Sequence, residues 1–269
     1  MQLKSVEDIT TSHRHIFLSP HFDDAVYSCG GTLGVQVSVG LRPLVITVFS
    51  GTPDSINLSA YALDVHRQMG FSQDITNAIQ TRRQEDSAAL ELLGVDYLWL
   101  NYSDAIYRGN PAYYTSDSQL MGGEVNPGDN WIDEELAETL VALRKRLPDA
   151  VWYAPLGVGR HVDHQIVCSA ADRLTASGAK VNLYEDFPYV ARHAGSLVER
   201  LEEFGNLLEP GLVEMSEMLP IRQEAAAKYA SQIAPNFGDR TLLFQSMENY
   251  TQNIRPVETV HLERYWTAR

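Results

Sequence analysis

Short apolar runs, rich in β-branched and aromatic residues, alternate along the chain with segments of helical periodicity. The runs have the length and composition of buried β-strands, and they cover residues 15–20, 43–50, 96–103, 150–155 and 180–186. Residues 82–94 and 132–147 have a helical pattern instead, and the second segment is followed by Pro148. Gly94 is placed to end the first of these helices. Strands that alternate with helices predict an α/β fold, with a mostly parallel sheet flanked by helices on both faces.

Two polar segments interrupt this alternation, at residues 51–80 and 108–130. Loops of this length in a compact domain are often lids or binding loops, and disorder is an equally weighted alternative. At 269 residues the chain has room for one large α/β domain or for two small ones. We expect a single domain over residues 1–269, with lid or insertion loops at the two polar segments.

The composition narrows the possible classes of function. The formal net charge is −14, from 21 basic and 35 acidic side chains, so the basic face that nucleic-acid phosphates require is not expected. Two cysteines, Cys29 and Cys168, cannot form a disulfide framework and suggest a reducing compartment. The N-terminal segment has no apolar core of signal-peptide length, and no segment is long and uncharged enough to span a bilayer. We therefore expect a cytoplasmic protein without nucleic-acid binding or membrane insertion.

Candidate metal ligands follow the first predicted strand, in the stretch PHFDDAVYSCGG at residues 20–31. In open parallel sheets, ligands bind beyond the carboxyl ends of the strands, which is where His21, Asp23 and Asp24 are expected. Two adjacent carboxylates at the end of a buried strand need a specific reason, since surface charges can be solvated anywhere. A metal site is one such reason.

A second cluster follows the strand predicted at 150–155, in the stretch RHVDH. Its His161 and His164 are three residues apart and would share one face of a helix, with Asp163 pointing elsewhere. A His and a carboxylate from one strand end, with a His from another, form a ligand set suited to Zn²⁺ or Fe²⁺. The second aspartate of the adjacent pair would then lie outside the ligand set and take a proton from the metal-bound water.

Each stretch alone also has a simpler structural interpretation. An aspartate at a strand-to-helix turn is often an N-cap, and Asp163 next to histidines could form a surface ion pair. The two stretches together favour the metal site, because both fall at predicted strand ends of one sheet. The segment CGGTLG at residues 29–34 lacks the GxGxxG spacing of a dinucleotide site, and the preceding aspartates would repel a pyrophosphate.

The motifs PHFDDA and HVDH resemble those of the LmbE-like family of de-N-acetylases. That family includes N-acetylglucosaminylphosphatidylinositol deacetylase and the deacetylases of mycothiol and bacillithiol biosynthesis. The segments RRQEDSAALELLGV and RQEAAAKYASQ resemble two further family motifs, with Arg222 in place of a lysine, so the resemblance covers residues 14–235. Phe22 replaces the proline of the first motif and Ala25 its frequent glutamate, and a tyrosine that some members carry ahead of HxDH is absent.

The resemblance implies a Rossmann-like fold and assigns roles by position in the motifs. The implied metal is Zn²⁺, with Fe²⁺ as the alternative, and its ligands would be His21, Asp24 and His164. Asp23 would be the general base. His161 would support the oxyanion or protonate the leaving amine, and Asp163 would orient one of the histidines.

Substrate contacts are expected on two sides of this site. Arg82, with its helix, and a loop that carries Tyr113 and Tyr114 would cover a sugar ring. For Arg82 the alternative is an ion pair with an acid on its own helix. Arg160 would bind an anionic group of the substrate, or would be an ordinary surface arginine.

These inferences predict a zinc-dependent hydrolase that removes an N-acetyl or other N-acyl group from an amino sugar or its conjugate. One alternative is an amidase acting on a thiol conjugate or a natural-product intermediate. Another is a non-catalytic, sugar-binding member of the fold. The expected partner is a small N-acetylated sugar or conjugate, and the sequence leaves homo-oligomerisation open.

Overall fold

The computed structural model describes residues 1–53, 58–193, 195–255, 257 and 259–268. Within these residues, strands form one 7-stranded sheet in the order β3-β2-β1-β4-β5-β7-β6. The parallel strands are β1 (His15–Ser19), β2 (Leu44–Thr47), β3 (Asp96–Trp99), β4 (Val151–Pro155) and β5 (Lys180–Tyr184). Antiparallel pairing adds β7 (Leu262–Ala268) to β5, and then β6 (Leu208–Glu214) to β7.

The parallel strands lie where the apolar runs predict them, and the α/β prediction is confirmed. The strand predicted at 96–103 is shorter than expected, because the chain leaves the sheet after Trp99. The pattern does not reveal β6, since most of its residues are exposed and Pro210 and Gly211 interrupt it. A strand that packs so little apolar surface has no signature in hydrophobicity.

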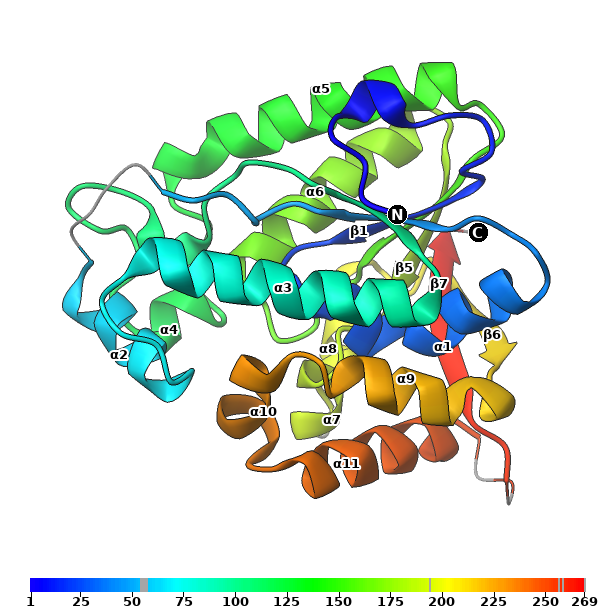
Figure 1. The fold of residues 1–269 in the computed structure, drawn as a ribbon. Coiled ribbons are helices and arrows are strands. Elements are labelled where there is room, and N and C mark those ends of the chain that lie inside the picture. Colours follow the sequence, from blue (N-terminus) through cyan, green and yellow to red (C-terminus); the bar gives the residue numbers. More distant parts are fainter. Residues whose placement is uncertain (54–57, 194, 256, 258, 269) are drawn as a thin grey trace.

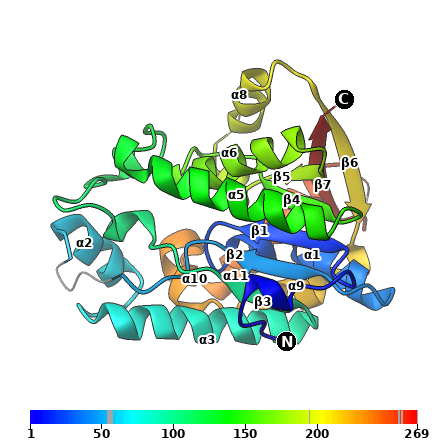
Figure 2. The same cartoon turned by 90° about the horizontal axis from the view of Figure 1, so that it is seen from above.

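Helices cover both faces of the sheet (Figures 1 and 2). One face packs against α1 (Asp24–Ser38), α3 (Ile75–Leu93), α9 (Leu219–Ala226), α10 (Ala230–Phe237) and α11 (Arg240–Asn253). The other face packs against α5 (Asn130–Arg146), α6 (Val162–Ala176) and α8 (Ser196–Glu203). Among the described residues, no helix is both long enough and apolar enough to cross a bilayer.

Short elements gather beyond the carboxyl ends of the parallel strands. They are α2 (Ala60–Gln68), α4 (Asp117–Leu120), α7 (Tyr189–Arg192) and the 3₁₀ turn η2 (Ala105–Tyr107). Three further 3₁₀ turns in the described part of the chain are η1 (Val6–Asp8), η3 (Pro127–Asp129) and η4 (Ser216–Met218).

The strand order reverses between β1 and β4. From β1 the chain continues to β2 and β3 on one side, whereas β4 leads to β5 on the other. The loops that follow β1 and β4 therefore leave the sheet in opposite directions and open a crevice between them, the usual ligand position in such sheets. Both candidate metal motifs follow these two strands.

The segment 51–80 contains more helix than its polar composition predicts, and the expectation of a long loop is wrong there. It carries α2 and the first turns of α3, while residues 54–57 lie outside the described part of the chain. The helix predicted at 82–94 is the second part of α3, and its first turns bury only Ile75, Ala78 and Ile79 among polar residues, so they fall within the segment expected as a loop. Gly94 ends this helix at φ +72°, as predicted. The segment 108–130 is mostly loop, with α4 and η3 within it.

The two glycines after the first motif let α1 approach its neighbours closely. A Cβ on Gly30 would lie 2.9 Å from Cγ of Arg222 on α9. A Cβ on Gly31 would lie 2.7 Å from Cγ of Met215. The Gly31 N–H donates to Glu263 of β7 at 2.8 Å, and Glu263 pairs with the buried Arg222 at 3.3 Å. Glycine is therefore needed here for packing of the helix that carries the adjacent aspartates.

Candidate active site

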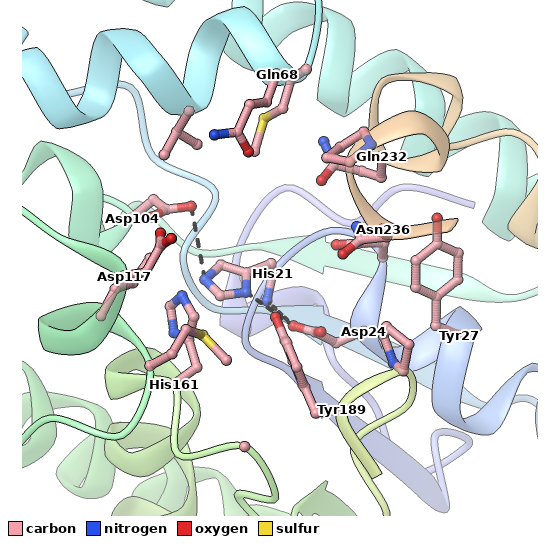
Figure 3. Close-up of a pocket in the computed structure, with 18 of the residues that line it drawn as sticks. His21, Asp24, Tyr27, Gln68, Asp104, Asp117, His161, Tyr189, Gln232 and Asn236 are labelled. Carbon is pink, nitrogen blue, oxygen red and sulfur yellow. Dashed lines mark hydrogen bonds and ion pairs between the residues drawn. The ribbon is translucent and has the colours of Figure 1, made fainter. Parts of the chain in front are cut away.

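A cavity of about 530 Å³ opens at the crevice between β1 and β4. His21, Asp23, Asp24 and His161 line it (Figure 3). α2 and α4 border one part of the cavity, and α7 and α10 border another. The structure thus brings both sequence motifs to one cavity, as the strand-end argument predicts.

Backbone bonds to side chains shape the turn after β1. Ser19 Oγ donates to the carbonyl of His21 at 2.6 Å and accepts from the N–H of Ala25 at 2.9 Å. Asp24 Oδ2 accepts the N–H of His21 at 2.7 Å. Asp23 is the residue before the helix, yet its side chain makes no capping hydrogen bond. The simple N-cap interpretation of Asp23 therefore fails.

His21, Asp24 and His164 form a group that can hold a metal ion. One ligand atom from each lies within 4.8 Å of the others, and all three residues are buried. Asp24 Oδ2 is 3.2 Å from His21 Nδ1 and 3.2 Å from His164 Nε2. Nε2 of His164 is buried and finds no hydrogen-bond partner among the described residues. Two imidazole nitrogens and a carboxylate oxygen thus converge in a buried position where one nitrogen makes no hydrogen bond, and this donor set fits a bound divalent metal.

Two further carboxylates hold the outer nitrogens of these histidines. Asp186 Oδ1 is 2.6 Å from Nδ1 of His164, and Asp163 Oδ2 is 2.9 Å from Nε2 of His21. Each imidazole thus faces Asp24 with one nitrogen and a carboxylate with the other. Metal-binding histidines are commonly oriented in this way, which also fixes their tautomer.

Asp163 does not point away from the site, and it forms no surface ion pair. Its side chain is fully buried, and its carboxylate also pairs with Arg108 at 2.6 Å and accepts the N–H of Ala105 at 3.1 Å. The expectation that it points elsewhere is wrong because it depended on the whole HVDH stretch being helical. The helix begins only at Val162, and its first turn faces the end of β1.

A second group of metal-capable residues shares His21 with the first and adds His161 and Asp163. The carboxylate of Asp163 is already engaged by Arg108 and a backbone N–H. Among the described residues, no arginine or lysine pairs with the carboxylate of Asp24, whose ionic contacts are His21 and His164. The Asp24 group is therefore the better candidate for a metal position.

His161 precedes α6 as its N-cap residue, so it does not share a helical face with His164. Its Nδ1 accepts the N–H of Asp163 at 3.1 Å, which leaves Nε2 to carry the proton. Burial, followed by the nearby His21, holds the pKa of His161 well below its usual range. In its neutral form the ring offers one N–H donor, at Nε2.

Asp23 lines the cavity without belonging to either metal-capable group. Burial and the neighbouring charge of Asp24 raise its pKa, while Arg82 opposes this shift. A carboxylate with a raised pKa is a better proton acceptor near neutral pH. The two adjacent aspartates therefore differ in their surroundings, since only Asp24 belongs to a metal-capable group.

Arg82 reaches across to the first motif. Its NH2 is 3.3 Å from Asp23 Oδ1 and its NH1 is 3.6 Å from Asp104 Oδ2. Its guanidinium lies over the ring of Phe22, 5.3 Å from the centroid. The replacement of the motif's proline thus supplies an aromatic platform for Arg82.

The alternative pairing of Arg82 within its own helix does not occur. Glu85 bonds to Ser231 of α10, and Asp86 accepts from Trp99 and Tyr229. Both acids are thus committed to other elements. Arg82 remains at the cavity, although two carboxylates hold it.

The other expected substrate contacts lie away from this cavity. Tyr114 is buried, and its hydroxyl donates to Asp129 at 2.7 Å. Tyr113 lines a separate cavity of about 340 Å³. Arg160 forms a surface ion pair with Glu203 at 2.7 Å, which matches the surface interpretation. Tyr113 and Tyr114 turn toward η3 within the loop 108–130, whereas other residues of the same loop, Asp117, Leu120 and Met121, line the cavity.

Sequence reasoning missed Asp104, Asp186 and Arg108. Asp104 lies 3.8 Å from His21 Nε2 and follows β3, and Asp186 follows β5. Both therefore lie beyond the carboxyl ends of parallel strands, and the rule that found the histidines applies to them too. The strand-end rule does not reveal Arg108, because this residue lies in a loop after η2. Its partner Asp163 comes from α6, far along the sequence.

This fold and cluster define an LmbE-like α/β protein with a site suited to a divalent metal. Residues 16–175 match the family described as GlcNAc-PI de-N-acetylase, PIG-L. The chain belongs to this family, which confirms the resemblance and the placement among hydrolases that act on amides.

Curated relatives include two proteins named 2'-N-acetylparomamine deacetylase. The protein from Niallia circulans is 30% identical over 238 residues, covering 83% of this chain and 82% of the relative. The protein from Streptomyces fradiae is 31% identical over 223 residues, covering 81% and 73%. Over most of its length, the chain is thus similar to N-deacetylases of amino sugars.

Solved structures of similar fold include two deacetylases. The zinc-inhibited form of teicoplanin deacetylase Orf2 has a TM-score of 0.78 and 26% identity, covering 94% of this chain and 97% of that chain. The A40926 pseudoaglycone deacetylase Dbv21 has a TM-score of 0.75 and 25% identity, covering 96% and 98%. The whole domain, beyond the matched family segment, therefore has a counterpart among deacetylases.

Proposed function

We propose that the protein is a zinc-dependent N-deacetylase that releases acetate from an N-acetylated amino sugar or a conjugate of one. The observation that carries this proposal is the buried group of His21, Asp24 and His164, with Asp23 beside it in an open cavity. The names of the relatives support an acetylated amino sugar as substrate. The zinc-inhibited form of one similar deacetylase supports Zn²⁺, with Fe²⁺ as the alternative.

The residues of the chain divide the work of amide hydrolysis. When bound, Zn²⁺ supplies a Lewis acid that polarises the amide carbonyl and makes water more acidic. Asp23 takes a proton from the attacking water, and the Nε2–H of His161 donates a hydrogen bond to the developing oxyanion. As the C–N bond breaks, the protonated Asp23 is placed to return the proton to the leaving amine. Arg82 holds Asp23 in position.

We further propose that residues 1–269 act as one domain in the cytoplasm, in which the two polar segments form the rim of the cavity. Residues of both segments line the cavity, which supports this interpretation. They come from the end of α2 (Val65, Gln68 and Met69) and from α4 and the residue after it (Asp117, Leu120 and Met121). A cavity of about 530 Å³ is within the range that accommodates a small sugar conjugate.

A metal analysis tests the proposal most directly. Purified protein is expected to carry about one Zn²⁺ or Fe²⁺ per chain, because the ligand group is buried and oriented by Asp163 and Asp186. Chelation should abolish acetate release from 2'-N-acetylparomamine or N-acetylglucosamine, and stoichiometric metal should restore it. Zn²⁺ should be titrated from below one equivalent, since one similar structure is a zinc-inhibited form.

Two results would contradict this assignment. One is the absence of transition metal together with activity that chelators do not affect. The other is binding of N-acetylated sugars without any acetate release by the metal-loaded protein, which would favour a non-catalytic binding protein. Acetate release confined to thiol conjugates would keep the hydrolase and change the substrate class.

Arg82→Gln should lower kcat by about 10- to 100-fold with little change in KM, because Arg82 acts by holding Asp23. Metal content should remain normal. The matched control is Arg83→Gln on the same helix, since Arg83 donates to the carbonyl of Ser50 and does not line the cavity. A rise in KM with unchanged kcat would instead make Arg82 a substrate contact.

A further inference from the structure

One side of the cavity presents neutral polar groups from α1 and α10. Tyr27, Gln232 and Asn236 lie on this side, and Asp104 and Asp117 lie on the opposite side of His21 (Figure 3). None of these groups takes part in the proposed hydrolysis. These groups are therefore available to bind parts of the substrate other than the amide that is hydrolysed.

The hydroxyl of Tyr27 is buried without a partner. The residue is 1% exposed and lines the cavity, and among the described residues its hydroxyl finds no hydrogen-bond partner. Buried polar atoms are almost always paired, so an unpaired one needs an explanation such as a ligand or water. The hydroxyl of Tyr229, its neighbour, is by contrast bonded to Asp86 at 2.8 Å.

Aromatic packing fixes the position of the Tyr27 hydroxyl. The ring makes edge contacts with Tyr229 and Phe237, at centroid distances of 5.6 Å and 5.5 Å and interplanar angles of 77° and 85°. The carbonyl of Tyr27 is itself held by a guanidinium N–H of Arg222. Burial, with the charges of Asp23 and other acids, raises the pKa of Tyr27, so the group keeps its proton as a donor.

Gln232 is held next to the same part of the cavity. Gln232 is 4% exposed, and its amide nitrogen lies 2.9 Å from Ser231 Oγ. Ser231 is fixed in turn by two bonds to Glu85, at 2.8 Å and 2.6 Å. The Gln232 carbonyl oxygen is thus left for a donor in the cavity.

The position of Tyr27 relative to Asp23 determines which part of a bound substrate Tyr27 can contact. The two residues are four apart at the start of α1, so they share a face of the helix, with Cβ atoms roughly 6 Å apart. A substrate whose amide lies at Asp23 would place a neighbouring ring substituent near Tyr27. A sugar hydroxyl can both donate and accept, which suits a cavity lined by both a neutral tyrosine hydroxyl and an amide group.

We propose that Tyr27, with Gln232 beside it, is a specificity-determining contact that binds a ring hydroxyl of the sugar near its acetamido group. This inference rests on the proposed deacetylase function and adds the feature of the substrate that the cavity selects. The selected class is a pyranose with a free hydroxyl close to the N-acetylated carbon. A simple acetamide would lack this contact.

Tyr27→Phe tests the contact against 2'-N-acetylparomamine and its 3'-, 4'- and 6'-deoxy analogues. The variant should lower kcat/KM for the parent substrate by about three- to tenfold, the effect of losing one neutral hydrogen bond. For one deoxy analogue, wild type and variant should be equal, and that analogue identifies the hydroxyl. The melting temperature should not fall, since the lost hydroxyl has no partner among the described residues.

Tyr229→Phe is the matched control, because it removes a buried hydroxyl that is bonded within the protein. This control should lower the melting temperature and leave the ratio between parent and deoxy substrates unchanged. Equal kcat/KM for Tyr27→Phe and wild type on the parent substrate would overturn the proposal and indicate a water at this position. An equal loss on every analogue would also overturn it. Both results would leave acetate release by the wild type, and hence the proposed function, intact.

Discussion

Asp23→Asn should lower kcat by about 10²- to 10⁴-fold while the protein keeps its metal. The amide preserves the shape of the side chain and can still contact Arg82, but it cannot accept a proton from water. The carboxylate of Asp23 lies outside the metal-capable groups, so its loss should not release metal. The measurements are kcat for acetate release and metal content by elemental analysis.

The contrast with Asp24→Asn makes this prediction specific. Asp24 Oδ2 lies 3.2 Å from nitrogens of both His21 and His164, so this change should lower metal affinity as well as activity. If Asp23→Asn loses metal as completely as Asp24→Asn does, the roles of the two aspartates are reversed. If Asp23→Asn retains full kcat, another group accepts the proton.

His164→Ala and His161→Ala should fail in different ways, although both histidines belong to one short motif. His164→Ala removes a proposed ligand whose Nδ1 is held by Asp186 at 2.6 Å, so it should lower metal affinity, and excess Zn²⁺ should restore part of the activity. His161→Ala should bind metal normally and lose about 10²- to 10³-fold in kcat, the usual effect of losing one oxyanion donor. KM should change little.

Asp186→Ala provides an intermediate case. It leaves the ligand atoms in place and removes only the support of His164, so metal affinity should fall by about 10- to 100-fold. Titration of the metal-free variants with Zn²⁺ measures all three affinities. An equal loss of metal in His161→Ala and His164→Ala would mean that both rings are ligands, and the assignment of His161 as a donor to the oxyanion would be wrong.

The positions of the two motifs at the sheet could be predicted because they depend on short-range patterns. The apolar runs that become β1 and β4 end just before His21 and His161, and strand alternation with helices makes the sheet parallel. Parallel strands bring their carboxyl ends to one edge, so the two motifs had to meet near that edge. The periodicity of α5 was equally direct, and its residues Ile132, Leu136, Leu140 and Leu143 are buried.

Side-chain roles were predicted less well where they depend on partners far away in the sequence. Helical spacing alone predicts that Asp163 points away from the site, and only the family resemblance assigns it to orient a histidine; the structure places it on His21, which is 142 residues earlier in the chain. Tyr114 was expected at the substrate, but its partner is Asp129 at the far side of the loop. Arg82 was expected to bind the substrate or an acid on its own helix, and it binds Asp23 and Asp104.

By itself, the sequence determined the α/β class, the family and the candidate metal ligands, because each depends on residue types at short, regular spacings. Only the tertiary structure decided which carboxylate holds each histidine, which arginine faces the cavity and which buried tyrosine hydroxyl has no partner among the described residues. Those outcomes depend on how α1, α3 and α10 pack together and on where α6 begins. The residues involved are far apart in the sequence, so short-range sequence patterns do not predict their contacts. The hydroxyl of Tyr27 is such a case, since its burial and its lack of a partner in the described part of the chain arise only once the helices have packed.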